Sequence, residues 1–172
     1  RYGVSVLPVR SVGQRGDDRS YGLPVALSGP EKWEELFEYA RTLPQKHSDI
    51  TRVVYSFGNR IDKAIGIRRA DTRLDDGSVD LLRCKADKIA RDVMRLAGLD
   101  HKLSQVPVVL LPTGIDKLRQ HSVVIRTFLT TNFMTGTPAM PGTELMPLEV
   151  LHDMVDRILA IDGIAHVLYD MT

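Results

Sequence analysis

Two apolar, valine-rich stretches lie near the start of the chain, at residues 4–12 and 21–27, and a polar segment separates them. Such runs are typical of β-strands. The segment between them contains four residues that favour turns, namely Gly13, Gly16, Asp17 and Asp18. The pattern therefore predicts a β-hairpin with a polar tip. This tip either approaches a polar ligand through its glycine backbone or is a solvated loop.

Amphipathic helices are predicted after this hairpin and twice more along the chain. In the first, apolar residues recur every three or four positions and so share one helix face: Trp33, Leu36, Phe37, Ala40 and Leu43. Ser28 is expected to cap this helix with Glu31 as its partner, Pro30 falls in the first turn, and Pro44 lies near the end.

The second and third helices show the same periodicity. The second has Ser78 as a candidate cap and Gly98 as its stop, and its apolar stripe is Leu82, Ala86, Ile89, Val93 and Leu96. The third opens at Pro147, and its apolar face is Leu148, Leu151, Val155 and Ile158. Both helices are therefore expected to bury one side.

Further strands are predicted at 50–57, 108–112, 122–130 and 164–171. A turn is expected at Thr113 and Gly114. The stretch 58–78 mixes many arginines and aspartates without clean periodicity, so it is interpreted as a charged, solvated connector.

The chain also contains an internal repeat. Residues 50–55 (ITRVVY) and 164–169 (IAHVLY) are identical at three of six positions and both apolar at a fourth, and each follows a predicted helix and a predicted strand. The offset of 114 residues (164 − 50) favours duplication of a ββαβ unit. We therefore predict an α+β fold of two ββαβ halves, related by a pseudo-two-fold axis, with helices packed on mixed sheets. The expected parts are a first subdomain at 1–78, a linking helix at 79–103 and a second subdomain at 104–172.

Composition excludes several classes of protein. The net charge of +1 and the pI near 8.1 fall short of the basic footprint of a nucleic-acid binder. The single cysteine, Cys84, excludes an internal disulfide framework and fits a reducing compartment. There is neither a long apolar run nor a signal-peptide pattern, so we expect a soluble, cytoplasmic protein without membrane contact.

Common catalytic and metal-binding motifs are absent from the sequence. It has no P-loop, no pyrophosphatase-type ATP loop and no nucleophile elbow, and its histidines lack the spacing of a zinc site. We propose no metal site and interpret Cys84 as a bystander thiol. Gly13–Gly16 matches the G-x-x-G loop of KH modules, but both of its flanks resemble strands, whereas that family places helices there.

Several longer motifs resemble the C-terminal domain of glutamine-hydrolysing GMP synthase. They extend over almost the whole chain: LPVRSVG at 7–13, GDDRSY at 16–21, TRVVY at 51–55, SQVPV at 104–108, SVVIRTF at 122–128, FMTG at 133–136 and LYDMT at 168–172. The doubled architecture resembles the long form of that enzyme, in which two dimerisation subdomains replace the pair contributed by two chains.

This resemblance implies a part of a carbon–nitrogen ligase. In the family, an amidotransferase domain releases ammonia from glutamine, and a second domain uses ATP and Mg²⁺ to activate xanthosine 5′-monophosphate (XMP), which ammonia converts to GMP. The C-terminal domain helps to bind XMP and forms a dimer or pseudo-dimer contact. The family's substrate-binding aspartate corresponds to Asp17 and its glutamine to Gln105. A carboxylate and an amide suit the hydroxyl and ring N–H groups of a nucleotide.

The resemblance also has limits that shape the expectations. The ATP and glutaminase motifs are not in these residues, so we expect no bound cofactor and no activity from the chain alone. The family's terminal SKPPGTTEWE segment, which supplies a lysine and a glutamate to XMP, would begin after Thr172. The competing hypothesis is a free-standing interaction or RNA-binding module, which would bind no XMP.

Overall fold

A computed structural model describes residues 1–15, 18–58, 61, 67–69, 77–104, 106–115, 121–130 and 136–172 of the chain. Its helices are α1 (Trp33–Lys46), α2 (Gly77–Leu96) and α3 (Leu148–Leu159). Its strands are β1 (Gly3–Val6), β2 (Ser11–Arg15), β3 (Asp18–Ser28), β4 (Ile50–Ser56), β5 (Ile67–Arg69), β6 (Val108–Leu111), β7 (Thr113–Ile115), β8 (His121–Ile125), β9 (Phe128–Thr130), β10 (Gly136–Pro138) and β11 (Ile164–Asp170). The expected α+β class is confirmed.

The centre of the molecule is one mixed sheet. Its strands lie in the order β1-β3-β4-β11-β8-β6, with β2 paired to β3 beyond this row. The pairs β3–β4 and β8–β11 are parallel, whereas β4–β11, β1–β3 and β6–β8 are antiparallel. The remaining strands form two small two-stranded sheets, β5–β7 and β9–β10.

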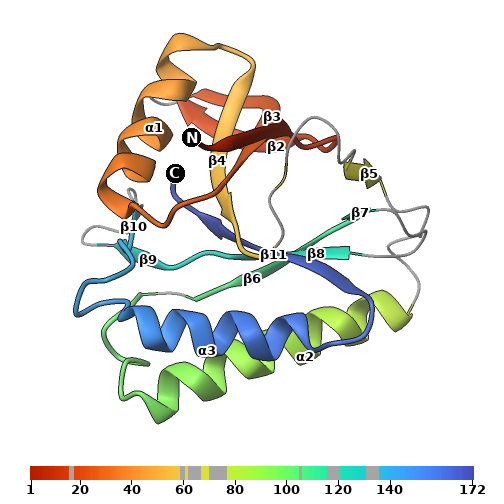
Figure 1. The fold of residues 1–172 in the computed structure, drawn as a ribbon, viewed down its shortest axis with the longest axis vertical. Coiled ribbons are helices and arrows are strands. Elements are labelled where there is room, and N and C mark those ends of the chain that lie inside the picture. The colour runs from red at the N-terminus through yellow and green to blue at the C-terminus, as the bar shows by residue number, and fades with distance from the viewer. Residues whose placement is uncertain are drawn as a thin grey trace.

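All three helices lie on the same face of this sheet, and α2 and α3 pack side by side (Figure 1). Because side chains alternate along a strand, each central strand contributes to both faces. Val53 and Tyr55 of β4 enter the large core beneath the helices, whereas Val54 between them joins a smaller cluster on the other face. That smaller cluster comprises Leu7, Ala26, Val54, Ile61, Val124 and Leu168. The face away from the helices is thus thinly covered.

The two halves share one connectivity. The first contains β1, β3, α1 and β4, and the second contains β6, β8, α3 and β11, each with a parallel crossover and an antiparallel outer strand. The halves meet at the antiparallel pair of β4 with β11, where Tyr55 lies opposite Tyr169. These two tyrosines are also equivalent positions of the sequence repeat. The pseudo-two-fold relation itself stays a prediction.

The predicted first strand, 4–12, is in fact two strands. Residues 7–10 interrupt it, and Pro8 in this break cannot donate to a strand ladder. β1 pairs with the second half of β3, and β2 pairs with its first half. The turn is also tighter than predicted, because Gly13 lies in β2 and Asp18 lies in β3.

The start predicted for the first helix is wrong. Ser28 is the last residue of β3, where its buried hydroxyl donates to the Ile61 carbonyl and accepts from the Ile61 amide. The helix begins at Trp33 after Lys32 and continues through Pro44 to Lys46. The second helix begins at Gly77, so Ser78 lies in its first turn. Its stripe is shifted: Leu96 is 75% exposed, while Val79, Ala90 and Met94 are buried.

Two other predicted boundaries also differ. The strand predicted at 122–130 is divided at Arg126 and Thr127 into β8 and β9, which belong to different sheets. Thr113 and Gly114 form β7 instead of a turn. The predicted charged connector contains strand β5, which pairs with β7, although much of that stretch lies outside the described residues.

Candidate functional site

Asp17 and Gln105, the two predicted substrate-binding residues, both lie outside the described residues. The described residues next to them show where these two segments of the chain lie. Asp18 starts β3, and Val106 and Pro107 lead into β6. The strand pairing brings the starts of β4 and β6 and the ends of β8 and β11 to the end of the sheet from which the β2–β3 hairpin extends. The chain segments on either side of both positions therefore approach the same end.

A buried ionic cluster occupies this end of the sheet. One carboxylate oxygen of Asp170, Oδ2, accepts hydrogen bonds from Nη1 of Arg52 and Nε of Arg126, each at 2.9 Å. The other oxygen, Oδ1, accepts from the backbone amide of Thr172 at 3.0 Å and from its hydroxyl at 2.8 Å. The Asp170 side chain is only 1% exposed, so its charge depends on these partners.

Neighbouring strands position the three charged side chains. Asp170 ends β11 between β4, which supplies Arg52, and β8, which Arg126 follows directly. The Arg126 amide donates to the Pro107 carbonyl at 3.1 Å, and its guanidinium lies over the Phe128 ring, 4.8 Å from the centroid. Since Arg52 belongs to the first half and Asp170 to the second, the cluster also joins the two halves.

A shallow hollow of about 110 Å³ opens beside this cluster on the thinly covered face of the sheet. Its polar lining consists of Arg10, Ser11, Arg52, Arg126 and Asp170, and its apolar lining comes from β3, β4, β6, β8 and the 7–10 break. Three arginines against one aspartate leave a formal charge of +2 around the hollow. The arrangement suits an anion or a polar ligand.

Sequence reasoning did not identify this cluster. Arg52 lies in the TRVVY motif and, in the repeat, at the position equivalent to His166; Asp170 lies in the LYDMT motif, and neither pattern indicates an ion pair. In the structure these repeat equivalents differ, since Arg52 is an ion-pair donor whereas His166 is 4% exposed. Burial lowers the pKa of His166, against a smaller opposing effect of its hydrogen bond with the Phe57 backbone.

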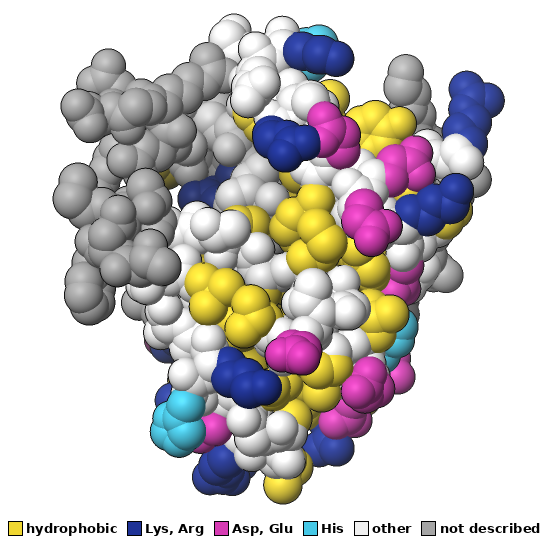
Figure 2. Space-filling model, turned by 90° about the vertical axis from the view of Figure 1, so that its left-hand side faces the viewer, with side chains coloured by type: hydrophobic (Ala, Val, Ile, Leu, Met, Phe, Trp, Pro, Cys, Tyr) yellow, Lys and Arg dark blue, Asp and Glu magenta, His cyan; other side chains and the backbone are white. Residues whose placement is uncertain are grey.

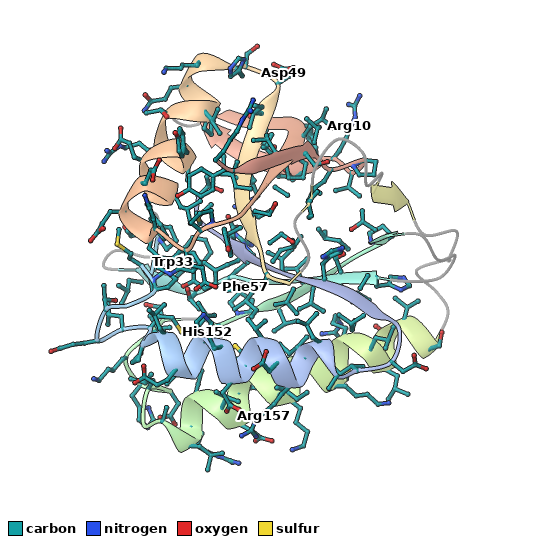
Figure 3. The ribbon with its side chains drawn as sticks, viewed as in Figure 1. Arg10, Trp33, Asp49, Phe57, His152 and Arg157 are labelled. Carbon is teal, nitrogen blue, oxygen red and sulfur yellow. The ribbon has the colours of Figure 1, made fainter. Side chains whose placement is uncertain are left out.

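Between the start of α1 and helix α3 the contacts are mainly aromatic, and among the described residues fewer charged groups meet there than around Asp170. Trp33, Phe57 and His152 lie together there (Figure 3), and Nε2 of His152 is 2.8 Å from the Glu31 carboxylate. The neighbouring surface, on the side of α1, mixes apolar, acidic and basic side chains (Figure 2). A nucleic-acid interface would instead show a continuous patch of positive charge on such a surface.

Other predicted features can be placed on the described part of the chain. Cys84 is exposed on α2. In the described ranges, no three His, Cys, Asp or Glu side chains gather as a metal site would require, and no helix there has the length and apolarity needed to cross a membrane. The start of the G-x-x-G segment, Gly13, lies in β2 and not in a helix.

Comparison with known proteins gives a consistent family. No family model matches the chain. It is 39% identical to a probable glutamine-hydrolysing GMP synthase of Caenorhabditis elegans and 34% identical to the GMP synthase of Dictyostelium discoideum, in each case over 97% of this chain and 25% of the relative. A probable GMP synthase of Leptospira interrogans is 34% identical over 97% of this chain and 27% of its own length. Nearly the whole chain is therefore similar to GMP synthases, and it spans about a quarter of the length of these relatives.

Proposed function

We propose that this chain is the C-terminal, substrate-binding and dimerisation region of a cytoplasmic GMP synthase, and that it helps to bind XMP for ATP- and glutamine-dependent amination to GMP. The observation that carries the proposal is the match of 97% of the chain to GMP synthases at 34–39% identity. The chain spans about a quarter of those relatives, so the amidotransferase and ATP-activating parts would belong to other domains.

In this proposal Asp17 and Gln105 contact XMP. The carboxylate of Asp17 accepts hydrogen bonds from the nucleotide, and the amide of Gln105 both donates and accepts. The approach of their flanking segments to one end of the sheet supports a shared ligand. ATP and Mg²⁺ act in the whole enzyme, outside these residues.

Steady-state kinetics of the full-length enzyme that carries this chain tests this assignment. Asp17→Asn and Gln105→Ala should each raise the KM for XMP about tenfold or more, because a charged or oriented hydrogen bond to substrate is lost. The KM for ATP and for glutamine should stay unchanged. Asp49→Asn and Gln45→Ala, which replace exposed residues, are the matched controls. An unchanged KM for XMP in both site variants would remove the assignment.

The dimerisation role concerns the junction of the two halves. We propose that the β4–β11 contact within one chain takes the place of a contact between two chains, which the shared connectivity of the halves supports. The full-length enzyme should then sediment as a monomer at micromolar concentration. A stable dimer in which these strands pair between chains would contradict this part of the proposal.

A further inference from the structure

The hollow beside Asp170 combines an apolar floor with arginine donors that the protein leaves unused. Asp170 employs only Nε of Arg126, and within the described residues nothing bonds to the two Nη groups of that guanidinium. Arg10 lines the same hollow and is exposed, with no hydrogen-bond or ion-pair partner in the described part of the chain. Two arginines whose guanidinium groups have unused N–H donors in the described part of the chain thus line one small hollow.

The ionic cluster fixes the direction of one of these groups. Arg126 is held through Nε by a carboxylate that is 1% exposed, and the Phe128 ring lies under its guanidinium. A guanidinium anchored on one edge keeps its remaining N–H groups in a rigid fork, which is the geometry that binds phosphate oxygens in pairs. Arg52 differs, because its Nη1 bonds to both Asp170 and the Thr172 carbonyl, so one of its two terminal nitrogens is already engaged.

Charge and size favour a small anion. The lining carries a formal charge of +2, and a volume of about 110 Å³ accommodates a phosphate group but not a whole nucleotide. The hydroxyl of Ser11, which shares a hydrogen bond with Thr51 Oγ1 at 2.7 Å, adds a polar group on the same rim. The apolar residues of the floor lower the local polarity, which strengthens such contacts.

We propose that Arg10 and Arg126 form a binding site for a phosphate monoester on the face of the sheet opposite the helices. The phosphate has two possible sources, the substrate nucleotide itself or a free phosphate. With the nucleotide as source, this inference rests on the proposed function and adds the residues that would receive the phosphate.

The test combines removal of an arginine with removal of the phosphate from the ligand. Binding of XMP and of xanthosine is measured calorimetrically on the full-length enzyme, for wild type, Arg10→Gln, Arg126→Gln and the control Arg157→Gln. Arg157 carries the same charge but lies on α3, far from Arg10 (Figure 3). Arg10→Gln involves no structural partner in the described residues, so it stays informative if Arg126→Gln fails to fold. A second titration uses inorganic phosphate alone.

Each outcome separates the alternatives. If the nucleotide is the source, both site variants weaken XMP about tenfold and leave xanthosine unchanged, and the control changes neither. If the source is free phosphate, XMP and xanthosine are unaffected, whereas saturable phosphate binding is lost in both site variants but kept in the control. If the folded site variants bind both XMP and inorganic phosphate as well as the wild type does, the proposed site is wrong. A failure of this site can be told apart from a failure of the Asp17 and Gln105 assignment. The Asp17 and Gln105 variants should weaken the binding of xanthosine as well as that of XMP, whereas the arginine variants should weaken only XMP.

Discussion

Tyr55 and Tyr169 lie opposite each other on β4 and β11, and the hydroxyl of each holds a loop of its own half. Tyr55 donates to the Gly29 carbonyl at 2.5 Å, and Tyr169 donates to the Ala139 carbonyl at 2.6 Å. Gly29 follows β3 before α1, and Ala139 lies after β8 before α3. Burial raises the pKa of Tyr55 to about 12 and also raises that of Tyr169, so both remain neutral donors near pH 7.

Removal of these hydroxyls should destabilise the two halves unequally. Tyr169→Phe loses the hydrogen bond to the Ala139 carbonyl and the contact with Thr127 Oγ1, which are both buried. It should lower the free energy of unfolding by about 1–3 kcal/mol. Tyr55→Phe loses one partly buried bond and should cost about 0.5–1.5 kcal/mol. Urea unfolding measures both, with the 70% exposed Tyr21 changed to Phe as control. An equal loss in all three would refute the unequal roles.

Neutralising Asp170 should be among the most damaging single changes. Asp170→Asn leaves Arg52 and Arg126 without their shared carboxylate, and these side chains are only 26% and 30% exposed. Because the two arginines retain some solvent, we expect a loss of about 2–3 kcal/mol in the free energy of unfolding. The exposed pair Arg157–Asp153 provides the control, since Asp153→Asn should cost about 0.5 kcal/mol or less. Similar losses for both variants would contradict the buried role of Asp170.

His166 should make stability depend on pH on the acid side. Its pKa is lowered by burial, so the folded state favours the neutral ring. Below the ordinary histidine pKa of about 6.5, the unfolded chain binds a proton that the folded chain resists, and stability falls as the pH falls towards the folded pKa. His166→Gln should flatten the change in unfolding free energy between about pH 7.5 and 5.5. His101→Gln, at an exposed position, is the control, and an unaltered profile in the His166 variant would reject the prediction.

Gly22 lies so close to the start of β4 that this position should not accept a larger side chain. A Cβ there would lie 2.4 Å from the Asp49 carbonyl oxygen and 2.6 Å from Cγ2 of Thr51. Gly22→Ala should therefore shift the β2–β3 hairpin and cost about 2 kcal/mol or more, as overpacking does. Gly77→Ala meets open space at the start of α2 and should stabilise by up to about 1 kcal/mol. Thermal unfolding compares the stability of the two variants. An unchanged stability of Gly22→Ala would mean that the hairpin backbone does not approach Asp49 and Thr51 this closely.

Local patterns predicted the regular elements well where apolar periodicity was strong. The segments that became α1, α3, β4 and β11 were all identified, because their apolar residues recur with the period of a helix or strand. Boundaries failed where a distant partner decides the structure. Ser28 resembles a helix cap in sequence, but the backbone of Ile61, 33 positions away, draws it into β3. The division at Arg126 falls within the strand-like run SVVIRTFLT at 122–130, where the Thr127 hydroxyl contacts the Tyr169 hydroxyl.

The sequence alone thus predicted the three helices, the main strands, their duplicated order and the family motifs, since each depends on patterns within short stretches of the chain. The tertiary structure decided which charges meet. Arg52 and Asp170 are 118 positions apart, and Arg126 and Asp170 are 44 apart, yet the antiparallel pair β4–β11 and the parallel pair β8–β11 place all three at one end of the sheet. Burial of Asp170 between its neighbouring strands, which makes those contacts strong, is a property of the packed sheet and has no signature in the chain.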